Sequence, residues 1–318
     1  MHLPDITHIK SQCLQFSIPC IQNPQTPLST TQWITEFLPQ LNHQIQEKGA
    51  VLLRGFPLYS LSEFQKIAEL LSRTLLDYIY RSTPRKMIGG KIYTSTEYSS
   101  SQIIPLHNEN SYSSLYPNRI FFFCSIPPNV GGQTPLTDSH LIYTKIPAEI
   151  RDLFTQKKLK YIRNFNKEID IPWQEAFQTN DKLKVEAICK NLNIDFKWLD
   201  NEHLHTWQIL PAVIQHPGTK AWVWFNQAHL FHISALAKEI QDEIIQAYSI
   251  NKIPRNVCFA DDSEIDFAML DSIRNVYTQH QLLFDWQRGD LLILDNIWMA
   301  HGRAAYSGDR KIVVAMGA

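Results

Sequence analysis

The 318-residue sequence predicts a mixed α and β fold with a mainly β core, arranged as a β-sandwich or open barrel packed by helices. Short strand-like segments separated by Gly/Asp turns form the end of the chain, and helical patterns lie mainly before and inside them. Eight Trp and sixteen Phe residues favour a sheet-rich core. The length suits one large domain with insertions or two domains, and we expect a single domain over residues 1–318.

Composition and charge argue against several classes of protein. The formal net charge of −1 gives no electrostatic case for binding nucleic acid or an acidic membrane. No apolar stretch is long enough to cross a bilayer, and residues 1–5 lack the pattern of a secretory signal. The five scattered cysteines form no Cys-x-x-Cys pair, so we expect reduced thiols and a cytoplasmic protein.

The first part of the chain predicts two helices around one buried strand. Apolar residues recur every four positions over residues 33–45, which is typical of a helix that Pro39 kinks or divides. Gly49 ends this helix, and residues 50–53 follow as a buried strand. Ser62 is the expected cap of the second helix. Its apolar face consists of Phe64, Ile67, Ala68 and Leu71.

The middle of the chain predicts strands. Residues 78–80 and 92–94 are rich in β-forming side chains. Residues 119–125 are apolar on both faces, which indicates a central strand. After a Pro/Gly turn, residues 133–138 are extended, and a short helix covers about 147–157.

Residues 166–255 are more polar, with helical patterns at 182–192 and 234–248 and one strong strand at 221–226. We interpret this segment as an insertion that covers a site, because long insertions in compact folds usually serve that purpose. A helix at 264–278 precedes the closing β segments. These are residues 281–286, 291–295, 297–303 and 310–315.

His107 and Glu109 are the starting point of the functional hypothesis. Alternate side chains of an extended segment point the same way, so both can face one point. An imidazole and a carboxylate aimed together are two-thirds of a 2-His-1-carboxylate site, which holds non-haem Fe(II) and leaves open positions for substrate and O₂. With 12 His and 31 acidic residues, chance alone supplies about one His-x-Asp/Glu pair, so other residues must support the hypothesis.

His301 is the candidate third ligand, because it follows an apolar strand and precedes a glycine; the alternative is a structural, hydrogen-bonding histidine. Arg310 lies nine positions later across a turn, so adjacent antiparallel strands would bring the two side chains together. An arginine on an apolar strand needs an acidic partner, either a structural Asp or Glu or a bound dicarboxylate. Thr134 would add a hydroxyl for that ligand, or is an ordinary strand threonine.

These motifs occur in an order that resembles the taurine dioxygenase (TauD/TfdA) family. They are His107-x-Glu109, the Gly-Gly-Gln-Thr-Pro-Leu-Thr-Asp segment 131–138, His301-Gly302-Arg303 and Arg310. Segments 93–98, 107–112 and 224–227 are similar to those of syringomycin-type amino-acyl hydroxylases, in the same clavaminate-synthase-like group. The likeness runs from about residue 50 to the end of the chain.

The resemblance implies a double-stranded β-helix, or jelly roll, with flanking helices and a lid insertion at about 166–255. It implies that His107, Glu109 and His301 bind Fe(II). Arg310 would pair with the distal carboxylate of the cosubstrate 2-oxoglutarate, and Thr134 would contact the same molecule.

The implied reaction is the O₂-dependent hydroxylation of an unactivated C–H bond in a small molecule. The expected substrate is an amino acid, free or tethered to a carrier protein, in specialised metabolism. Four arginines could meet a substrate carboxylate, namely Arg81, Arg85, Arg163 and Arg303, of which we favour Arg303. Asn226 is a further candidate for the wall of the substrate pocket.

Two departures from the family pattern narrow the range of possible reactions and substrates. Related halogenases replace the ligand carboxylate with a small residue, so the presence of Glu109, in place of the Asp of many members, disfavours halogenation. The taurine-binding side chains have no clear match, so taurine is not indicated. Desaturation and cyclisation remain alternatives to hydroxylation. A non-catalytic jelly-roll binding protein would lack a ligand or Arg310, and a zinc hydrolase would not need Arg310.

Overall fold

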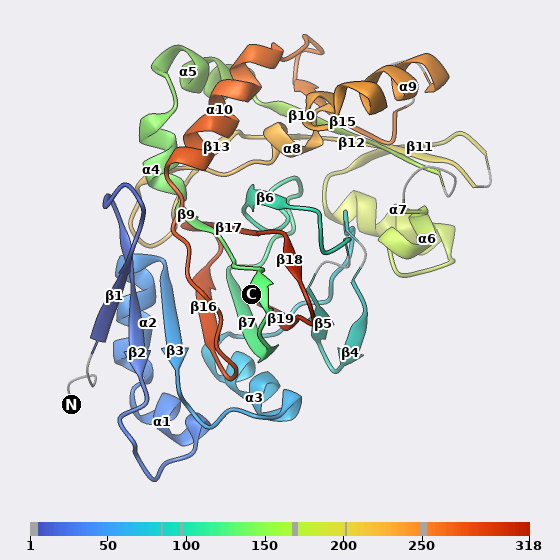
Figure 1. Cartoon of the computed structure of the whole chain (residues 1–318). Coiled ribbons are helices and arrows are strands. Elements are labelled where there is room, and N and C mark those ends of the chain that lie inside the picture. Colours follow the sequence, from blue (N-terminus) through green and yellow to red (C-terminus); the bar gives the residue numbers. More distant parts are fainter. Residues whose placement is uncertain (1–5, 84, 96–97, 167–170, 201, 249–252) are drawn as a thin grey trace.

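The computed structural model describes residues 6–83, 85–95, 98–166, 171–200, 202–248 and 253–318, and it has a mixed α and β fold with a sheet-rich core (Figure 1). Its largest element is an eight-stranded sheet, in which only the second and third strands pair in parallel. In spatial order the strands are β1 (Ile6–Lys10), β2 (Ser17–Gln22), β3 (Ala50–Arg54), β16 (Leu291–Asp295), β7 (Arg119–Ile126), β19 (Lys311–Gly317), β5 (Ile92–Thr94) and β4 (Met87–Gly89). The expected central place of β7 is confirmed, since it lies between β16 and β19.

Three helices cover one face of this sheet: α1 (Thr30–Glu36), α2 (Leu38–Lys48) and α3 (Leu61–Leu71). Alternate strand residues face opposite sides, so Phe121 packs with the helices and Phe122 with the opposite layer. The expected division of the first helix at Pro39 is confirmed, because Pro39 stands in the first turn of α2. Gly49 ends α2 in the left-handed conformation, with φ of 73°.

The cap of α3 is Ser60, so the prediction of Ser62 was wrong. The Ser60 hydroxyl accepts a hydrogen bond from the backbone N–H of Glu63, three residues further on. This spacing is the ordinary geometry of a serine cap, whereas Ser62 already lies inside the helix. The apolar face expected for this helix is buried as predicted.

A small sheet packs over the other face of the large one, in the order β6 (Ile104–His107), β17 (Met299–Arg303) and β9 (Leu136–Asp138). Leu136 and Met299 from this sheet share one hydrophobic cluster with Phe122 and Val314 of the large sheet. Next to this sheet in the chain, the short strand β18 (Tyr306–Ser307) pairs with β8 (Val130–Gly131). The strands of His301 and Arg310 were expected to be adjacent, and this was wrong, because β17 and β19 belong to different sheets.

A four-stranded sheet forms the upper part of the molecule in Figure 1, in the order β11 (Asp195–Trp198), β12 (Leu204–Leu210), β10 (Leu159–Phe165) and β15 (Arg255–Phe259). A strand does lie at 222–224, within the expected 221–226, but residues 166–255 also contain β11 and β12, which were not predicted. In β12, buried and partly exposed residues alternate, which is the period of a half-buried strand. A further hairpin joins β13 (Val213–Gln215) and β14 (Trp222–Trp224).

Several helices share a hydrophobic cluster with this upper sheet. They are α4 (Ser139–Lys145), α5 (Ala148–Lys157), α6 (Trp173–Ala176), α7 (Lys182–Asn191), α8 (Ala228–Phe231) and α10 (Phe267–Gln279). The short helix η1 (Ile233–Ala235) and α9 (Lys238–Tyr248) follow α8 in the chain. The helices expected at about 147–157, 182–192 and 264–278 are therefore confirmed.

Two predicted strands are irregular in the structure. Tyr80 has a positive φ of 58°, which an extended segment over 78–80 does not accommodate. Within 281–286, Leu282 makes one isolated bridge to Leu136 and no longer ladder. Both segments carry β-forming side chains because they pack in the core, not because they join a sheet.

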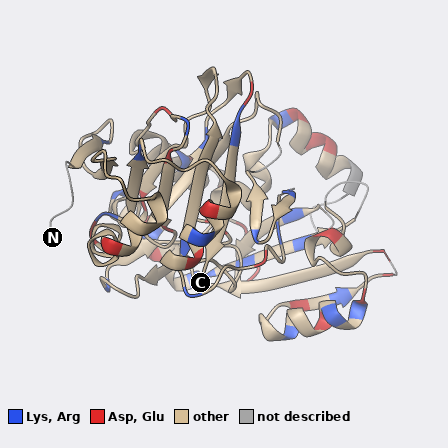
Figure 2. Ribbon diagram, turned by 90° about the horizontal axis from the view of Figure 1, so that it is seen from below, with Lys and Arg blue, Asp and Glu red and all other residues tan. Residues whose placement is uncertain are grey.

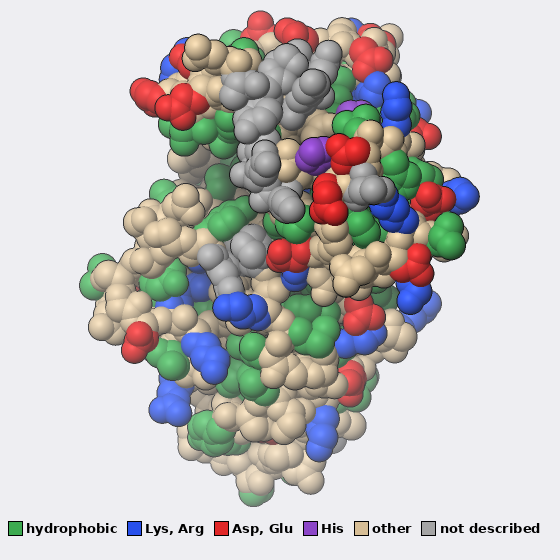
Figure 3. All heavy atoms as spheres, turned by 90° about the vertical axis from the view of Figure 1, so that its right-hand side faces the viewer, with side chains coloured by type: hydrophobic (Ala, Val, Ile, Leu, Met, Phe, Trp, Pro, Cys, Tyr) green, Lys and Arg blue, Asp and Glu red, His purple; other side chains and the backbone are tan. Residues whose placement is uncertain are grey.

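Charged residues lie mostly on helices and loops, and the strands of the large sheet are largely uncharged (Figure 2). On the face seen in Figure 3, hydrophobic side chains are dispersed among charged residues of both signs. In the described part of the chain no helix combines the length and the apolar character that a membrane span requires.

The contact between β6 and β17 leaves no room for a side chain at Gly302. A Cβ there would lie 2.6 Å from the backbone oxygen of Ile104. We expect Gly302→Ala to lower the free energy of unfolding by about 1–3 kcal/mol, measured by urea denaturation. The control is Gly89→Ala, where nothing lies within 4 Å of the added atom. An equal loss in both variants would contradict a close approach of the two strands.

Candidate active site

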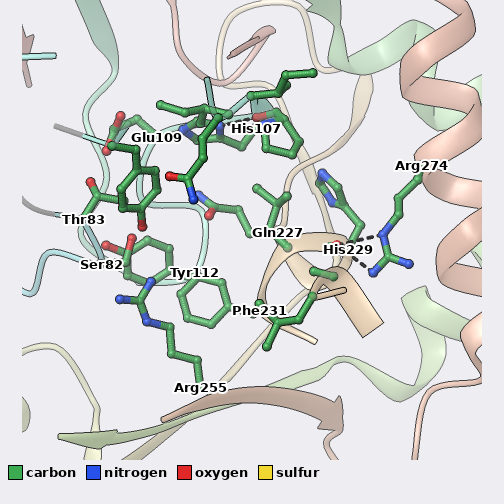
Figure 4. Close-up of a pocket in the computed structure, with 18 of the residues that line it drawn as sticks. Ser82, Thr83, His107, Glu109, Tyr112, Gln227, His229, Phe231, Arg255 and Arg274 are labelled. Carbon is green, nitrogen blue, oxygen red and sulfur yellow. Dashed lines mark hydrogen bonds between the residues drawn. The ribbon is translucent and has the colours of Figure 1, made fainter. Parts of the chain in front are cut away.

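The pairing of β6 with β17 sets two histidines directly opposite each other. His107 is the register partner of His301, and the centres of their rings are 4.7 Å apart. Glu109 lies in the turn after β6 and not on one strand face with His107 as expected. The ligand atoms of all three residues nevertheless lie within 4.8 Å of one another. Figure 4 shows His107 and Glu109 together at one end of a cavity.

Asn296 fixes the turn that carries Glu109, and sequence analysis missed this residue. Its side-chain oxygen accepts from the Glu109 backbone N–H at 2.7 Å, and its amide nitrogen donates to the Glu109 carbonyl oxygen at 3.0 Å. Asn296 is fully buried in the turn between β16 and β17. A polar residue directly after the apolar strand 291–295 was the available signal, but it is equally typical of any turn.

Arg85 holds the Glu109 side chain in its charged form. Its Nη2 donates to Glu109 Oε2 at 2.7 Å, and both side chains are almost fully buried. Burial by itself would raise the pKa of the Glu109 carboxyl, but the charge of Arg85 and the two histidines hold that pKa well below its usual value. The carboxylate is therefore available as an anionic ligand at neutral pH.

The histidines suit a metal as well. His107 Nδ1 lies 2.8 Å from the carbonyl oxygen of Pro105, which makes Nδ1 the protonated nitrogen and leaves the lone pair on Nε2. Desolvation, and then the neighbouring His301, lower the pKa of His107 to about 4, so the ring is neutral near pH 7. His301 Nε2 is 3.6 Å from Glu109 Oε2. Two imidazoles and one carboxylate are the donor set that Fe(II) accepts in a 2-His-1-carboxylate site.

Two more arginines order the segment that carries Arg85. Arg163, on β10 of the upper sheet, donates to the carbonyl oxygens of Tyr80 and Arg81. Arg81 in turn donates to the carbonyl oxygen of Arg85 and forms an ion pair with Glu175. Both were candidates for contact with substrate. Neither lines the cavities described below, and within the described residues they are engaged by backbone oxygens.

A cavity of about 540 Å³ opens beside His107 and Glu109. One wall comes from residues 78–83, Arg85 and residues 98–112, and the other from residues 227–236, Arg255 and α10 (Figure 4). Its polar lining includes Ser82, Thr83, Arg85, Tyr98, Gln102, Gln227, His229, Arg255 and Arg274.

A second, smaller cavity of about 30 Å³ lies on the other side of the histidines. It is lined by His301, Thr134, Arg303 and Arg310 among others, so the structure brings together the residues expected to hold 2-oxoglutarate. Arg310 donates to the Gly132 carbonyl oxygen and contacts no carboxylate among the described residues. Burial, and then Arg303, lower the pKa of Arg310 to about 10, which leaves it charged at neutral pH.

Thr134 is oriented by a tryptophan. Its hydroxyl oxygen accepts a hydrogen bond from Trp286 Nε1 at 3.1 Å. Because the oxygen accepts this bond, the hydroxyl proton remains free to be donated into the small cavity.

The two residues proposed for substrate contact lie elsewhere. Arg303 faces the smaller cavity, and its guanidinium donates to the carbonyl oxygens of Tyr98, Ser99 and Gln102. Asn226 is fully buried and bonds the backbone of Ala212 and Ala228. In the described structure Asn226 lines neither cavity, whereas its neighbour Gln227 does.

The sequence model of the family described as "Taurine catabolism dioxygenase TauD, TfdA family" matches residues 20–316. The chain belongs to this family. It is therefore a 2-oxoglutarate-dependent dioxygenase, and Fe(II), 2-oxoglutarate and O₂ are the cofactor and cosubstrates of this class, as the motifs led us to expect. Of the residues that carried the resemblance, Thr96 and Glu97 lie outside the described residues.

Individual relatives agree with the family assignment. The dapdiamide synthesis protein DdaC of Enterobacter agglomerans is 38% identical over 272 residues, 86% of this chain and 83% of its own. A clavaminate synthase-like protein of Arabidopsis thaliana is 26% identical over 301 residues, 90% of this chain and 86% of its own. The structure of PvcB from Pseudomonas aeruginosa shares the fold, with a TM-score of 0.59 at 12% identity over 98% of this chain and 90% of that one.

The geometry predicts metal binding by the three residues. We expect Mn(II) or anaerobic Fe(II), at about a hundred times its dissociation constant, to raise the unfolding temperature by roughly 5 °C. His107→Ala and His301→Ala should remove this shift, as followed by differential scanning calorimetry. His43→Ala is the control, since its side chain is 66% exposed on α2. A metal-dependent shift that survives in both ligand variants would refute the site.

Proposed function

We propose that the protein is a hydroxylase of specialised metabolism that acts on an unactivated C–H bond of an amino acid, either free or tethered to a carrier protein. One observation carries the proposal: His107, Glu109 and His301 converge between a large cavity and a small cationic one. The name of its relative DdaC, a dapdiamide synthesis protein, supports a role in specialised metabolism.

In this proposal His107, Glu109 and His301 hold Fe(II). The bound iron would let O₂ react with 2-oxoglutarate, which would be oxidised to succinate and CO₂ and take one oxygen atom, while the C–H bond would take the other. Arg310 and the Thr134 hydroxyl bind the distal carboxylate of the cosubstrate. The small cavity, of about 30 Å³, would take the distal carboxylate, and the rest of the cosubstrate would extend past His107 towards the large cavity. Arg85, Ile104 and His107 line both cavities, which makes them the boundary it would cross.

The proposal also includes an assignment of the fold. The eight-stranded sheet and the β6-β17-β9 sheet would be the two halves of a double-stranded β-helix within a single domain. Residues 166–255 would be its cover, and Gln227, Phe231 and Leu236 from this segment do line the large cavity. The cover excludes water from the reacting atoms and defines the space for the substrate.

The intact ligand set favours catalysis over a non-catalytic binding role. Arg310 favours an oxygenase over a zinc hydrolase, because a hydrolase has no use for a partly buried cation facing the second cavity. Desaturation or cyclisation would use the same residues, and hydroxylation is the simplest outcome for a substrate held near them.

Anaerobic titration with Fe(II) and 2-oxoglutarate tests the function directly. We expect a metal-to-ligand charge-transfer band in the visible spectrum. Arg310→Gln should weaken the binding of 2-oxoglutarate by about ten-fold to a hundred-fold, because a charge-assisted hydrogen bond contributes roughly 1.5–3 kcal/mol. Arg288→Gln, in an exposed turn, is the control. No band in the wild-type protein would refute the proposed function, and equal affinity in the Arg310 variant would refute the assignment of that residue.

A further inference from the structure

Gln227 presents an unused hydrogen-bond acceptor to the large cavity. Its side-chain Nε2 donates to the carbonyl oxygen of Asn108 at 2.8 Å. Because a carbonyl oxygen can only accept, this bond identifies the nitrogen end of the amide and directs Oε1 away from Asn108. Oε1 has no hydrogen-bond partner among the described residues, yet it is not shut off from the cavity that Gln227 lines (Figure 4). A ligand with a donor at this point would supply the missing hydrogen bond.

The Gln227 amide is held in place beside the candidate iron ligands. Asn108, which accepts its hydrogen bond, stands in the chain between His107 and Glu109. The backbone N–H of Gln227 donates to the Tyr161 hydroxyl at 2.8 Å, and the residue is only 5% exposed. An acceptor that is fixed before the ligand arrives loses little conformational entropy on binding.

Other polar groups of the same lining are already engaged. Arg274 donates to the His229 carbonyl oxygen and forms an ion pair with Asp271. The His229 ring is bonded through Nε2 to the Leu106 carbonyl oxygen at 2.9 Å. Oε1 of Gln227 is therefore an acceptor that the described protein leaves available for a ligand.

The charges around the cavity favour an uncharged donor over an ammonium group. The lining has one described carboxylate, that of Glu109, which is paired with Arg85 and is a candidate iron ligand. An ammonium group at Gln227 would therefore lose its hydration without gaining an anionic partner, and a compact, strongly hydrated charge is the donor that loses most in this way. The N–H of an amide is neutral, and one neutral amide oxygen satisfies it.

The size and the lining of the cavity favour a substrate larger than a free amino acid. The volume of about 540 Å³ falls in the range of roughly 300–1,000 Å³ that is typical of sites for drug-sized ligands. Ile103 and Leu236, which are 65% and 42% exposed, contribute apolar side chains to the lining. An acyl group on the nitrogen of an amino acid would occupy part of this space and cover apolar surface.

We propose that Gln227 binds the substrate by accepting a hydrogen bond from an amide N–H at Oε1, while Nε2 stays bonded to Asn108. This inference rests on the proposed function and narrows it to an amino acid that is acylated on nitrogen, as in an N-acyl amino acid or a peptide-like amide. Because the Gln227 amide is tied to the backbone between two candidate iron ligands, it would set where the substrate nitrogen and the neighbouring carbon atoms lie relative to the iron.

The test uses the full chain with Fe(II) and 2-oxoglutarate under anaerobic conditions. Three series of probes share the same side chains: N-acetyl L-amino acids, the O-acetyl esters of the matching 2-hydroxy acids, in which oxygen replaces the N–H, and the free amino acids. Binding is followed by the change that each probe causes in the charge-transfer band. We expect at least one N-acetyl amino acid to bind about five-fold or more tightly than its ester and its free amino acid.

Two variants of Gln227 and a matched control make the result specific. Gln227→Met removes the acceptor oxygen, so the preference for the amide over the ester should fall to about two-fold or less. If this variant does not fold, Gln227→Glu keeps an acceptor and adds a negative charge, and it should shift binding several-fold towards the free amino acids. The control is Gln208→Met, which should keep the preference. Gln208 is also buried with Nε2 bonded to a backbone oxygen, that of Leu192, but it lines neither described cavity.

The inference is overturned if no N-acetyl amino acid binds, if esters or free amino acids bind as well, if the preference survives in Gln227→Met, or if Gln208→Met removes it to the same extent. Its failure can be told apart from failure of the proposed function. Without a charge-transfer band the function itself is wrong, whereas a normal band without preference for the amide N–H refutes only the role of Gln227.

Discussion

The central constraint on this structure is a buried negative charge. Glu109 is 3% exposed, and an isolated carboxylate in that position would take up a proton. Arg85 keeps it charged, and Asn296 holds its backbone from both sides. Removing one member of such a buried pair typically costs about 3–5 kcal/mol. The turn after β6, the turn before β17 and the segment that carries Arg85 are therefore fixed with respect to one another.

The same constraint links the upper sheet to the site. Arg163 is 1% exposed and has no carboxylate among the described residues, yet it lies against Tyr80 and Phe165 and donates to two backbone oxygens. A guanidinium tolerates such burial better than an ammonium because it is more weakly hydrated and stacks on rings. The segment leading to Arg85 thus takes its position from β10, so the upper sheet and the candidate iron site form one hydrogen-bonded unit.

Much of this arrangement could be predicted from the sequence, because its signals are local. Periodic apolar residues and Gly49 located the N-terminal helices, and the apolar run 119–125 located the central strand. The contacts of Arg85 and Asn296 could not be predicted, since their partners lie 24 and 187 residues away in the chain. The upper sheet was missed because its strands are half-polar and pair only with one another. His301 and Arg310 were expected to meet on neighbouring strands, and they meet across two facing sheets, because one cavity can be lined from both.

Arg85 and Arg310 differ in their counter-ions, and this difference gives the two arginines different roles in the site. Arg85 is a buried cation and Arg310 a partly buried one, but Arg85 has an internal carboxylate and Arg310 contacts none in the described chain. A protein keeps a buried cation without a counter-ion only at a cost, and that cost is recovered when an anionic ligand binds. Arg310 therefore suits a ligand that supplies a whole charge, as a dicarboxylate does. Arg85 is already neutralised by Glu109, so its charge serves to hold that carboxylate in place among the candidate iron ligands.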